Sequence, residues 1–161
     1  MYIFQRHLIY FPSQTDPKLH DYQAEDMQVI TLHTQDGFML NSWYKPAKTN
    51  QATILYLHGN AGHIGGRMPL ARKFIDAGLG VLLLEYRGYG GNKGLPSEQG
   101  LYEDGRAGMR FLYQQGIKFG QIALYGESLG SGVATKLAVE NRICAVVLQS
   151  PYTSLSDLSR Y

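Results

Sequence analysis

The stretch "IALYGESLGSG" (residues 122–132) places Ser128 between Gly126 and Gly130, where an apolar run gives way to a helical pattern. The pattern G-x-S-x-G alone is weak, because it arises by chance in roughly one chain in twenty of this length. Its context is more specific. A strand that turns sharply into a helix needs small residues two positions before and after the turn, since the two backbones nearly touch there. The stretch therefore predicts a tight strand-to-helix turn with Ser128 in a strained position.

Apolar runs and helical patterns alternate along most of the chain. The expected strands are 52–62, 80–91, 121–126 and 143–154, and the expected helices between them are 68–80, 97–116 and 128–141. Such alternation indicates right-handed crossovers and a parallel sheet. The last strand is almost continuously apolar, which is expected of a strand covered on both faces. The glycine-rich loops follow strands and precede helices, so they should gather along one edge of the sheet, where ligands bind.

The segment 27–46 differs from the rest, because two strand-like runs flank the pair Asp36-Gly37. An Asp-Gly pair between such runs favours a hairpin. Within the helix expected at 97–116, Ser97 is the expected cap, and two interior glycines indicate close packing of one helix face on the sheet. The fold class predicted is α/β: a mostly parallel sheet with an N-terminal antiparallel hairpin and helices on both faces.

Composition limits the function classes. The 161 residues are 44% hydrophobic and 17% charged, which is typical of one globular domain. The net charge is +2 and the basic residues are scattered, so we expect no nucleic-acid partner. The single cysteine, Cys144, excludes an internal disulfide and lies in an apolar run. We expect it to be buried and inert.

The N-terminal segment "MYIFQRHLIYFPS" is too short and too polar to span a bilayer, and it lacks the features of a signal peptide. Two interpretations stay open: an aromatic arm that lies on the fold, or the downstream end of a membrane anchor that is absent here. We expect residues 1–26 to form this arm and 27–161 to form the domain. The expected location is cytoplasmic or membrane-peripheral, with membrane association through such an anchor.

The glycine-rich loops do not fit nucleotide sites. "HGNAGHIGG" and "RGYGGNKG" miss the G-x-G-x-x-G spacing, and Lys93 does not complete a P-loop. No His, Asp or Glu cluster has metal-ligand spacing, so we expect neither cofactor nor metal. The turn at Ser128 fits a nucleophile elbow instead. The N–H of Leu129 would then start a helix and face the attacked carbonyl oxygen, and a second N–H should come from "LHGNAG" (57–62), with Asn60 as the expected donor.

The ordered motifs "LHGNAG", "EYRGYGGNKGLPSEQGLYED", "YGESLGSG" and "LQSPYTSLSDL" make the chain similar to the α/β-hydrolase superfamily. Within it, the chain resembles small serine hydrolases that are often anchored by one N-terminal helix and are esterase- or peptidase-like. The resemblance covers nearly the whole chain. It implies Ser128 as nucleophile, Leu129 and Asn60 as oxyanion donors, and a small acyl substrate. Glu85 stands where the family usually has Asp, a change expected to have little consequence.

The order of residues departs from the family at the other end. The family's triad runs Ser, then Asp or Glu, then His, whereas all five histidines (7, 20, 33, 58 and 63) precede Ser128. The acids after Ser128 are Glu140, which reads as a solvated helix residue, and Asp157, which comes one strand too early. Ser154 is expected to cap a short helix there. The chain therefore looks C-terminally truncated, with an incomplete α/β-hydrolase fold.

An upstream base is the remaining alternative for catalysis. His58 lies in the oxyanion loop, but we favour a structural imidazole that holds the loop by hydrogen bonds, and His63 is weaker still. Two hypotheses follow. The chain is a serine hydrolase-type domain that cleaves an ester, thioester or amide at Ser128 but lacks the acid and His of the triad. Alternatively, it is an inactive truncated or pseudoenzyme module that binds or dimerises, with self-association through an open sheet edge.

Overall fold

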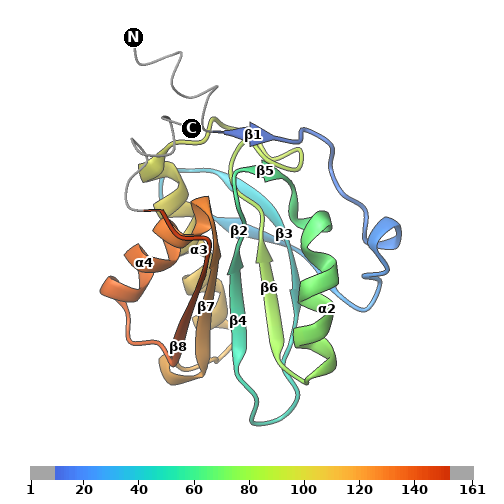
Figure 1. Cartoon of the computed structure of the whole chain (residues 1–161), viewed down its shortest axis with the longest axis vertical. Coiled ribbons are helices and arrows are strands. Elements are labelled where there is room, and N and C mark those ends of the chain that lie inside the picture. Colours follow the sequence, from blue (N-terminus) through green and yellow to red (C-terminus); the bar gives the residue numbers. More distant parts are fainter. Residues whose placement is uncertain (1–9, 153–161) are drawn as a thin grey trace.

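The computed structural model describes residues 10–152, which build a six-stranded sheet with helices on both faces (Figure 1). The strands are β2 (Gln28–His33), β3 (Met39–Lys45), β4 (Thr53–Leu57), β6 (Gly80–Leu84), β7 (Ile122–Glu127) and β8 (Ala145–Gln149). Their order across the sheet is β2-β3-β6-β4-β7-β8. A separate two-stranded sheet joins β1 (Phe11–Pro12) to β5 (Ala61–Gly62) in parallel. Ser154, Asp157 and His7, singled out above, lie outside the described residues.

The predicted hairpin is confirmed. Strands β2 and β3 pair antiparallel, with Gln28 opposite Tyr44 at one end and His33 opposite Met39 at the other. Gly37 has φ 92°, a left-handed conformation that glycine adopts without the usual steric cost. Strand β3 also pairs antiparallel with β6, and β6, β4, β7 and β8 run parallel. The sheet is thus mostly parallel with an N-terminal hairpin, as the sequence predicts.

The helices also fall where the patterns place them. They are α2 (Met68–Asp76), α3 (Glu98–Gln114) and α4 (Leu129–Glu140), with short 3-10 helices η1 (Leu19–Tyr22), η2 (Ile64–Arg67) and η3 (Phe119–Gln121). Ser97 caps α3 as expected, because its hydroxyl accepts a hydrogen bond from the N–H of Gly100 at 3.1 Å. In the described part of the chain, no helix combines the length and the apolarity needed to cross a bilayer.

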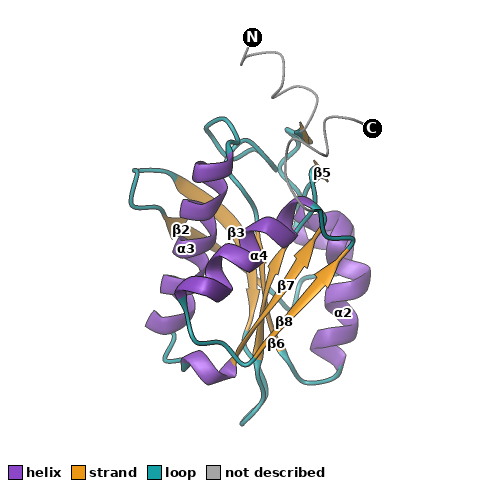
Figure 2. Ribbon diagram, turned by 60° about the vertical axis from the view of Figure 1, so that its left-hand side comes forward, coloured by secondary structure: helices purple, strands orange, loops and turns teal. Residues whose placement is uncertain are grey.

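Each face of the sheet has its own hydrophobic core, because side chains alternate along a strand. In β4, Leu55 and Leu57 belong to the cluster that includes residues of α3 and α4, whereas Ile54 and Tyr56 belong to the cluster that includes residues of α2. Figure 2 shows the sheet between α2 on one side and α3 and α4 on the other. Buried strands covered in this way explain the unbroken apolar runs in the sequence.

The two interior glycines of α3 lie where the helix approaches its neighbours most closely. A Cβ on Gly108 would lie 2.7 Å from Leu84 of the sheet, and one on Gly105 would lie 2.8 Å from Val133 of α4. The prediction that this helix face packs closely is confirmed. The absence of side chains at these two positions lets α3 contact both β6 and α4.

Residues 10–26 lie against the sheet domain. Tyr10 and Ala24 are buried in the two hydrophobic clusters, and β1 pairs with β5. The division of the chain at residue 26 stays a prediction.

The last strand corrects two expectations. All of β8 is exposed, including Val146, Val147 and Leu148, although its apolar run predicted cover on both faces. Cys144, expected to be buried, is exposed as well. The reason is position: among the described strands, β8 pairs only with β7 and forms the edge of the sheet. An apolar run indicates that a strand needs cover, but it does not say which strand ends the sheet.

A buried ion network fixes the loop after β6. The guanidinium of Arg87 binds Asp104 of α3 through Nε at 2.9 Å and Asp36 of the hairpin turn through Nη1 at 2.6 Å. Asp104 is fully buried, and burial raises its pKa to about 6 against the opposing effect of Arg87. Asp36 is partly exposed, and its hydrogen bonds with Arg87 lower its pKa to about 2. One cation therefore joins three segments that lie far apart in sequence.

Helix α4 begins against the end of β4. A Cβ on Gly130 would lie 1.9 Å from the carbonyl oxygen of Leu57 and 2.8 Å from that of His58. A Cβ on Gly126 would lie 2.7 Å from the carbonyl oxygen of Gly130. The neighbouring atoms are backbone, so they cannot move aside as a flexible side chain could. The requirement for small residues on both sides of Ser128, inferred from sequence, is confirmed.

Replacing Arg87 should destabilise the protein, because the buried carboxylate of Asp104 would lose its cation. Arg87→Met leaves Asp104 as an unpaired buried charge, and the free energy of unfolding should fall by about 3–5 kcal/mol near neutral pH. The pKa of Asp104 then rises further above its unfolded value, so the folded state binds the extra proton. Stability of this variant should increase as pH falls from about 7 to about 5. Urea unfolding at both pH values measures this, and Arg87→Met/Asp104→Leu should recover most of the loss. Equal stability of the single and double variants would contradict the assignment.

Adding one methyl group at Gly130 should be costly. Gly130→Ala places a carbon inside the contact with Leu57, so we expect a loss of about 1–3 kcal/mol or more in the free energy of unfolding. Gly120→Ala is the matched control, because no atom lies within 4 Å of a Cβ there. It should change stability by less than about 0.5 kcal/mol. Thermal unfolding compares the two, and a neutral Gly130→Ala would show that the contact is looser than described.

Candidate active site

Ser128 lies at the junction of β7 and α4 in a conformation that few non-glycine residues adopt. Its φ is 46° and its ψ is −111°. A backbone strained in this way costs roughly 1–3 kcal/mol and persists only where surrounding contacts impose it. Here the N–H of Ser128 donates to the carbonyl of Gln149 at 2.8 Å, and its own carbonyl accepts from the N–H of Ser131 at 2.8 Å. Hydrogen bonds to β8 and to the first turn of α4 therefore hold the backbone of Ser128 in this conformation.

The hydroxyl of Ser128 is not used to cap its helix. Serine at a helix N-terminus commonly accepts a hydrogen bond from an N–H of the first turn, but Ser128 makes no such side-chain bond. Leu129, the first residue of α4, has a buried side chain. Because Leu129 is the first residue of α4, its amide lies at the positive end of the helix dipole. It lies next to the Ser128 hydroxyl, which does not cap the helix.

The same junction lies beside the loop that follows β4. Because Gly130 contacts the carbonyls of Leu57 and His58, the first turn of α4 is held against the start of this loop. Asn60 follows two residues later and is partly exposed. The structure thus brings Ser128 and Leu129 to the same sheet edge as the segment that contains Asn60, as the parallel topology predicts.

Backbone pairing with the N-terminal arm holds the Asn60 segment from outside. The carbonyl of Asn60 accepts hydrogen bonds from the N–H of Phe11 at 2.9 Å and from the hydroxyl of Tyr89 at 3.1 Å. The N–H of Ser13 donates to the carbonyl of Gly62 at 3.0 Å. Burial raises the pKa of Tyr89, so its phenol stays neutral and donates. This loop is therefore fixed by two segments distant from it in sequence.

His58 supports the loop from inside. The side chain is completely buried, and Nδ1 lies 2.7 Å from the carbonyl oxygen of Gly59, to which it must donate. Nε2 lies 2.8 Å from Oε1 of Glu85, and Oε2 of Glu85 accepts from the N–H of Ile64 at 2.9 Å. Both ring nitrogens are engaged, which supports the structural interpretation of His58. Both ring nitrogens of His63 also have partners, in Gly65 and Tyr22.

The hydrogen bond from His58 has a geometric consequence for Asn60. The carbonyl of Gly59 and the N–H of Asn60 belong to one planar trans peptide, in which they point in opposite directions. Binding the carbonyl on the buried side therefore turns the N–H of Asn60 away from His58. Glu85 also holds this loop, because its carboxylate contacts His58 and accepts a hydrogen bond from the N–H of Ile64.

A pair of charged residues that the sequence did not predict lies at this edge. Arg67 of η2 and Glu127, the residue before Ser128, form an ion pair with a nitrogen-to-oxygen distance of 2.9 Å. Glu127 occupies the first variable position of the G-x-S-x-G pattern, and Arg67 follows the glycine-rich loop. Neither position belongs to a local pattern that would have paired them, because 60 residues separate them.

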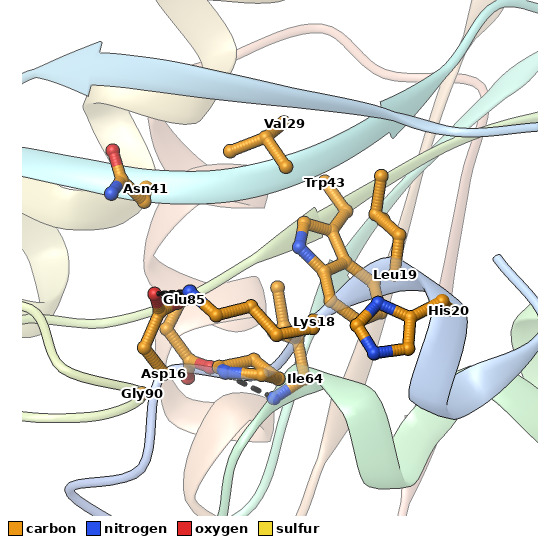
Figure 3. Close-up of a pocket in the computed structure, with 11 residues that line it drawn as sticks. Asp16, Lys18, Leu19, His20, Val29, Asn41, Trp43, Ile64, Glu85 and Gly90 are labelled. Atoms are coloured by element: carbon orange, nitrogen blue, oxygen red, sulfur yellow. Dashed lines mark hydrogen bonds and ion pairs between the residues drawn. The ribbon is translucent and has the colours of Figure 1, made fainter. Parts of the chain in front are cut away.

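A pocket of about 260 Å³ lies between the N-terminal arm and the hairpin (Figure 3). Its lining includes Asp16, Lys18, Asn41, Trp43 and Glu85. Neither Ser128 nor Leu129 nor Asn60 contributes to it. Both carboxylate oxygens of Glu85 already have partners, in His58 and Ile64. We therefore place the candidate site at the β7–α4 junction and not in this pocket.

Known structures share this fold. An α/β hydrolase from Vibrio vulnificus matches with a TM-score of 0.73 at 27% identity, over 85% of this chain and 50% of that chain. The Pyrococcus furiosus esterase Pf2001 matches with a TM-score of 0.74 at 23% identity, over 92% of this chain and 60% of that chain. At such low identity, the second likeness shows the fold alone.

Curated relatives match most of the chain. An uncharacterized protein of Mycobacterium tuberculosis is 43% identical over 157 residues, which are 96% of this chain and 56% of that protein. The protein bem46 of Schizosaccharomyces pombe is 34% identical over 98% of this chain and 57% of its own length. The lysophosphatidylserine lipase ABHD12 of Danio rerio is 39% identical over 71% of this chain and 32% of its own length.

The chain thus spans little more than half the length of the M. tuberculosis and S. pombe relatives. Residues 48–159 match the family described as serine aminopeptidase, S33. This range holds the 58–63 loop, the β7–α4 junction and the strands and helices between them. With the fold and the relatives in agreement, the chain belongs to the α/β-hydrolase superfamily and, within it, to the serine aminopeptidase S33 family.

Proposed function

We propose that Ser128 is the nucleophile of a serine hydrolase site and that the β7–α4 junction is its nucleophile elbow. The observation that carries this proposal is the strained backbone of Ser128, with φ 46° and ψ −111°, at a helix start that its hydroxyl does not cap. Strain of this kind is expected where a side chain must be presented to a substrate. Membership of a hydrolase family supports the same reading.

Two backbone amides would stabilise the negative charge that develops on the substrate. The N–H of Leu129 starts α4, where the helix dipole favours an anion. The N–H of Asn60 is the second donor. This assignment is supported by the planar peptide between Gly59 and Asn60. The carbonyl oxygen of that peptide lies 2.7 Å from Nδ1 of His58, which fixes the direction of the Asn60 N–H. Donors that are fixed before the reaction need no reorganisation when the charge appears.

The reaction would be acyl transfer. Oγ of Ser128 attacks the carbonyl carbon, its proton passes to a base, and the carbonyl oxygen becomes an oxyanion held by the two amides. The bond from the carbonyl carbon to the leaving group then breaks, which is C–O in an ester, C–S in a thioester and C–N in an amide. The leaving group takes the proton from the base, and water releases the acyl group from Ser128. We propose that the base and acid of the triad are not among these 161 residues. Without them, the oxyanion donors and substrate binding alone would leave catalysis of about 10³–10⁴ over water.

The substrate class proposed is a small acyl compound: an ester, thioester or amide. Among these, an ester is favoured, because the Danio rerio relative is named as a lysophosphatidylserine lipase.

A second function, self-association, is favoured by the exposed edge strand. Val146, Val147 and Leu148 are each at least 41% exposed on β8, and an unpaired strand edge readily accepts another strand. In this proposal the chain is a binding or dimerisation module, and the edge of β8 is its contact surface.

A fluorophosphonate probe tests the nucleophile. We expect slow covalent labelling of the wild-type chain at Ser128, located by mass spectrometry of peptides, and no labelling at that position in Ser128→Ala. Added imidazole should accelerate labelling of the wild type, because it supplies the proton acceptor, whose positioned form contributes about 10²–10⁴-fold in enzymes.

Ser131→Ala is the control, since it removes the next serine along the helix and leaves the proposed nucleophile. It should label like the wild type. Labelling that survives in Ser128→Ala, or a wild-type chain that imidazole does not activate, would refute the proposed role of Ser128.

Sedimentation velocity over a series of concentrations tests the second function. We expect a concentration-dependent dimer whose dissociation constant rises at least about tenfold in Val147→Lys, since a charge on an edge strand opposes pairing. Val139→Lys, on the exposed face of α4, should not change it. A chain that stays monomeric throughout the series would exclude self-association.

A further inference from the structure

Arg67 of η2 and Glu127, at the end of β7, form a bidentate ion pair next to the β7–α4 junction. Nη2 of Arg67 donates to Oε1 of Glu127 at 2.9 Å, and Nε donates to Oε2 at 3.2 Å. The two side chains are 14% and 25% exposed, so water screens the pair only partly. A fork of parallel hydrogen bonds fixes orientation as well as distance.

The third nitrogen of Arg67 holds the loop that contains Asn60. Nη1 donates to the carbonyl oxygen of Ala61 at 2.8 Å and to that of His63 at 3.4 Å. A planar guanidinium presents its donors in a rigid arrangement. Because the Nε–Nη2 edge of this group binds Glu127 and Nη1 binds the loop, the guanidinium sets the separation between them.

Glu127 is held in turn from the sheet side. The hydroxyl of Tyr56, on β4, donates to Oε2 of Glu127 at 3.2 Å. Burial and the charge of Glu127 raise the pKa of Tyr56, so its phenol stays protonated. A Cβ on Gly59 would lie 3.0 Å from Oε1 of Glu127. The residue that begins the peptide of Asn60 therefore lies directly against the carboxylate.

We propose that Arg67 and Glu127 are positioning residues that fix the amide of Asn60 relative to Ser128. This inference rests on the proposed function, since it assigns a role within that site. The pair connects the residue that precedes Ser128 to the loop that supplies the second oxyanion donor. A displacement of about 1 Å in such an arrangement can cost on the order of 100-fold in rate.

Positioning and simple electrostatics predict opposite effects of removing Glu127. The carboxylate lies next to Ser128 in sequence, and its negative charge opposes a developing anion. If only charge mattered, Glu127→Ala would leave Arg67 as a free cation and speed the reaction. If positioning matters, the loop loses its link to the β7–α4 junction and the reaction slows.

The chain offers a matched control in Arg106 and Glu140. Nε of Arg106 donates to Oε2 of Glu140 at 2.9 Å, Nη2 contacts Oε1, and the side chains are 27% and 28% exposed. This second bidentate pair joins α3 to α4 and does not contact the 58–63 loop. Glu140→Ala thus removes a similar ion pair without touching the site.

The experiment measures fluorophosphonate labelling of the full 161-residue chain at several probe concentrations. In Glu127→Ala we expect the labelling rate at saturating probe to fall about 10- to 100-fold, with the half-saturating concentration changed less than about twofold. Glu127→Gln should lie between this variant and the wild type, because its amide oxygen can still accept one bond from Arg67. Glu140→Ala should match the wild type.

Hydrogen exchange of the peptide covering residues 58–66 provides a readout that needs no reaction. It should be faster in Glu127→Ala and unchanged in Glu140→Ala. If the wild type labels at Ser128 and Glu127→Ala labels equally or faster, the inference is wrong and the proposed function survives. If the wild type does not label, the proposed function fails, and unchanged exchange in Glu127→Ala would then refute the positioning role as well.

Discussion

The contact between Gly130 and the carbonyl of Leu57 determines how β7, α4 and the loop after β4 meet. No side chain fits between them, because even a Cβ would come within 1.9 Å of the oxygen. Two backbones that approach so closely force β7 to turn into α4 within one residue, and Ser128 takes the strain of that turn. The same contact places the start of α4 beside the loop after β4. A hydroxyl, a helix N-terminus and a glycine-rich loop therefore come together because of where two glycines lie.

Three sets of interactions then immobilise that loop from different directions. The arm pairs with it through Phe11 and Ser13, His58 and Glu85 hold its buried side, and Arg67 joins it to Glu127. Each set satisfies backbone groups of a segment that has little regular secondary structure of its own, and leaving such groups unpaired when buried is costly. A loop held in this way can present an amide in a fixed direction. That property is what charge stabilisation at a reacting carbonyl requires.

Most of the fold could be predicted from sequence because its signals are local. The Asp36-Gly37 turn and the Ser97 cap depend on residues a few positions apart, and the glycines of α3 stand out within one helical pattern. The structure has all of them. The glycines around Ser128 were predicted for the same reason. Long-range partners could not be predicted: 60 residues separate Arg67 from Glu127, and 51 separate Arg87 from Asp36. The exposure of β8 and Cys144 was also missed, since an apolar run says nothing about which strand forms the edge of a sheet.

We propose that the hydroxyl of Ser128 faces two amides, those of Leu129 and Asn60. A crystal structure of the chain after reaction with a small fluorophosphonate tests this proposal, because the phosphoryl oxygen then occupies the place of the oxyanion. We expect a bond from phosphorus to Oγ of Ser128, with the phosphoryl oxygen about 2.7–3.1 Å from both amide nitrogens. An oxygen that points to solvent, or that is bound by groups other than these two amides, would contradict it.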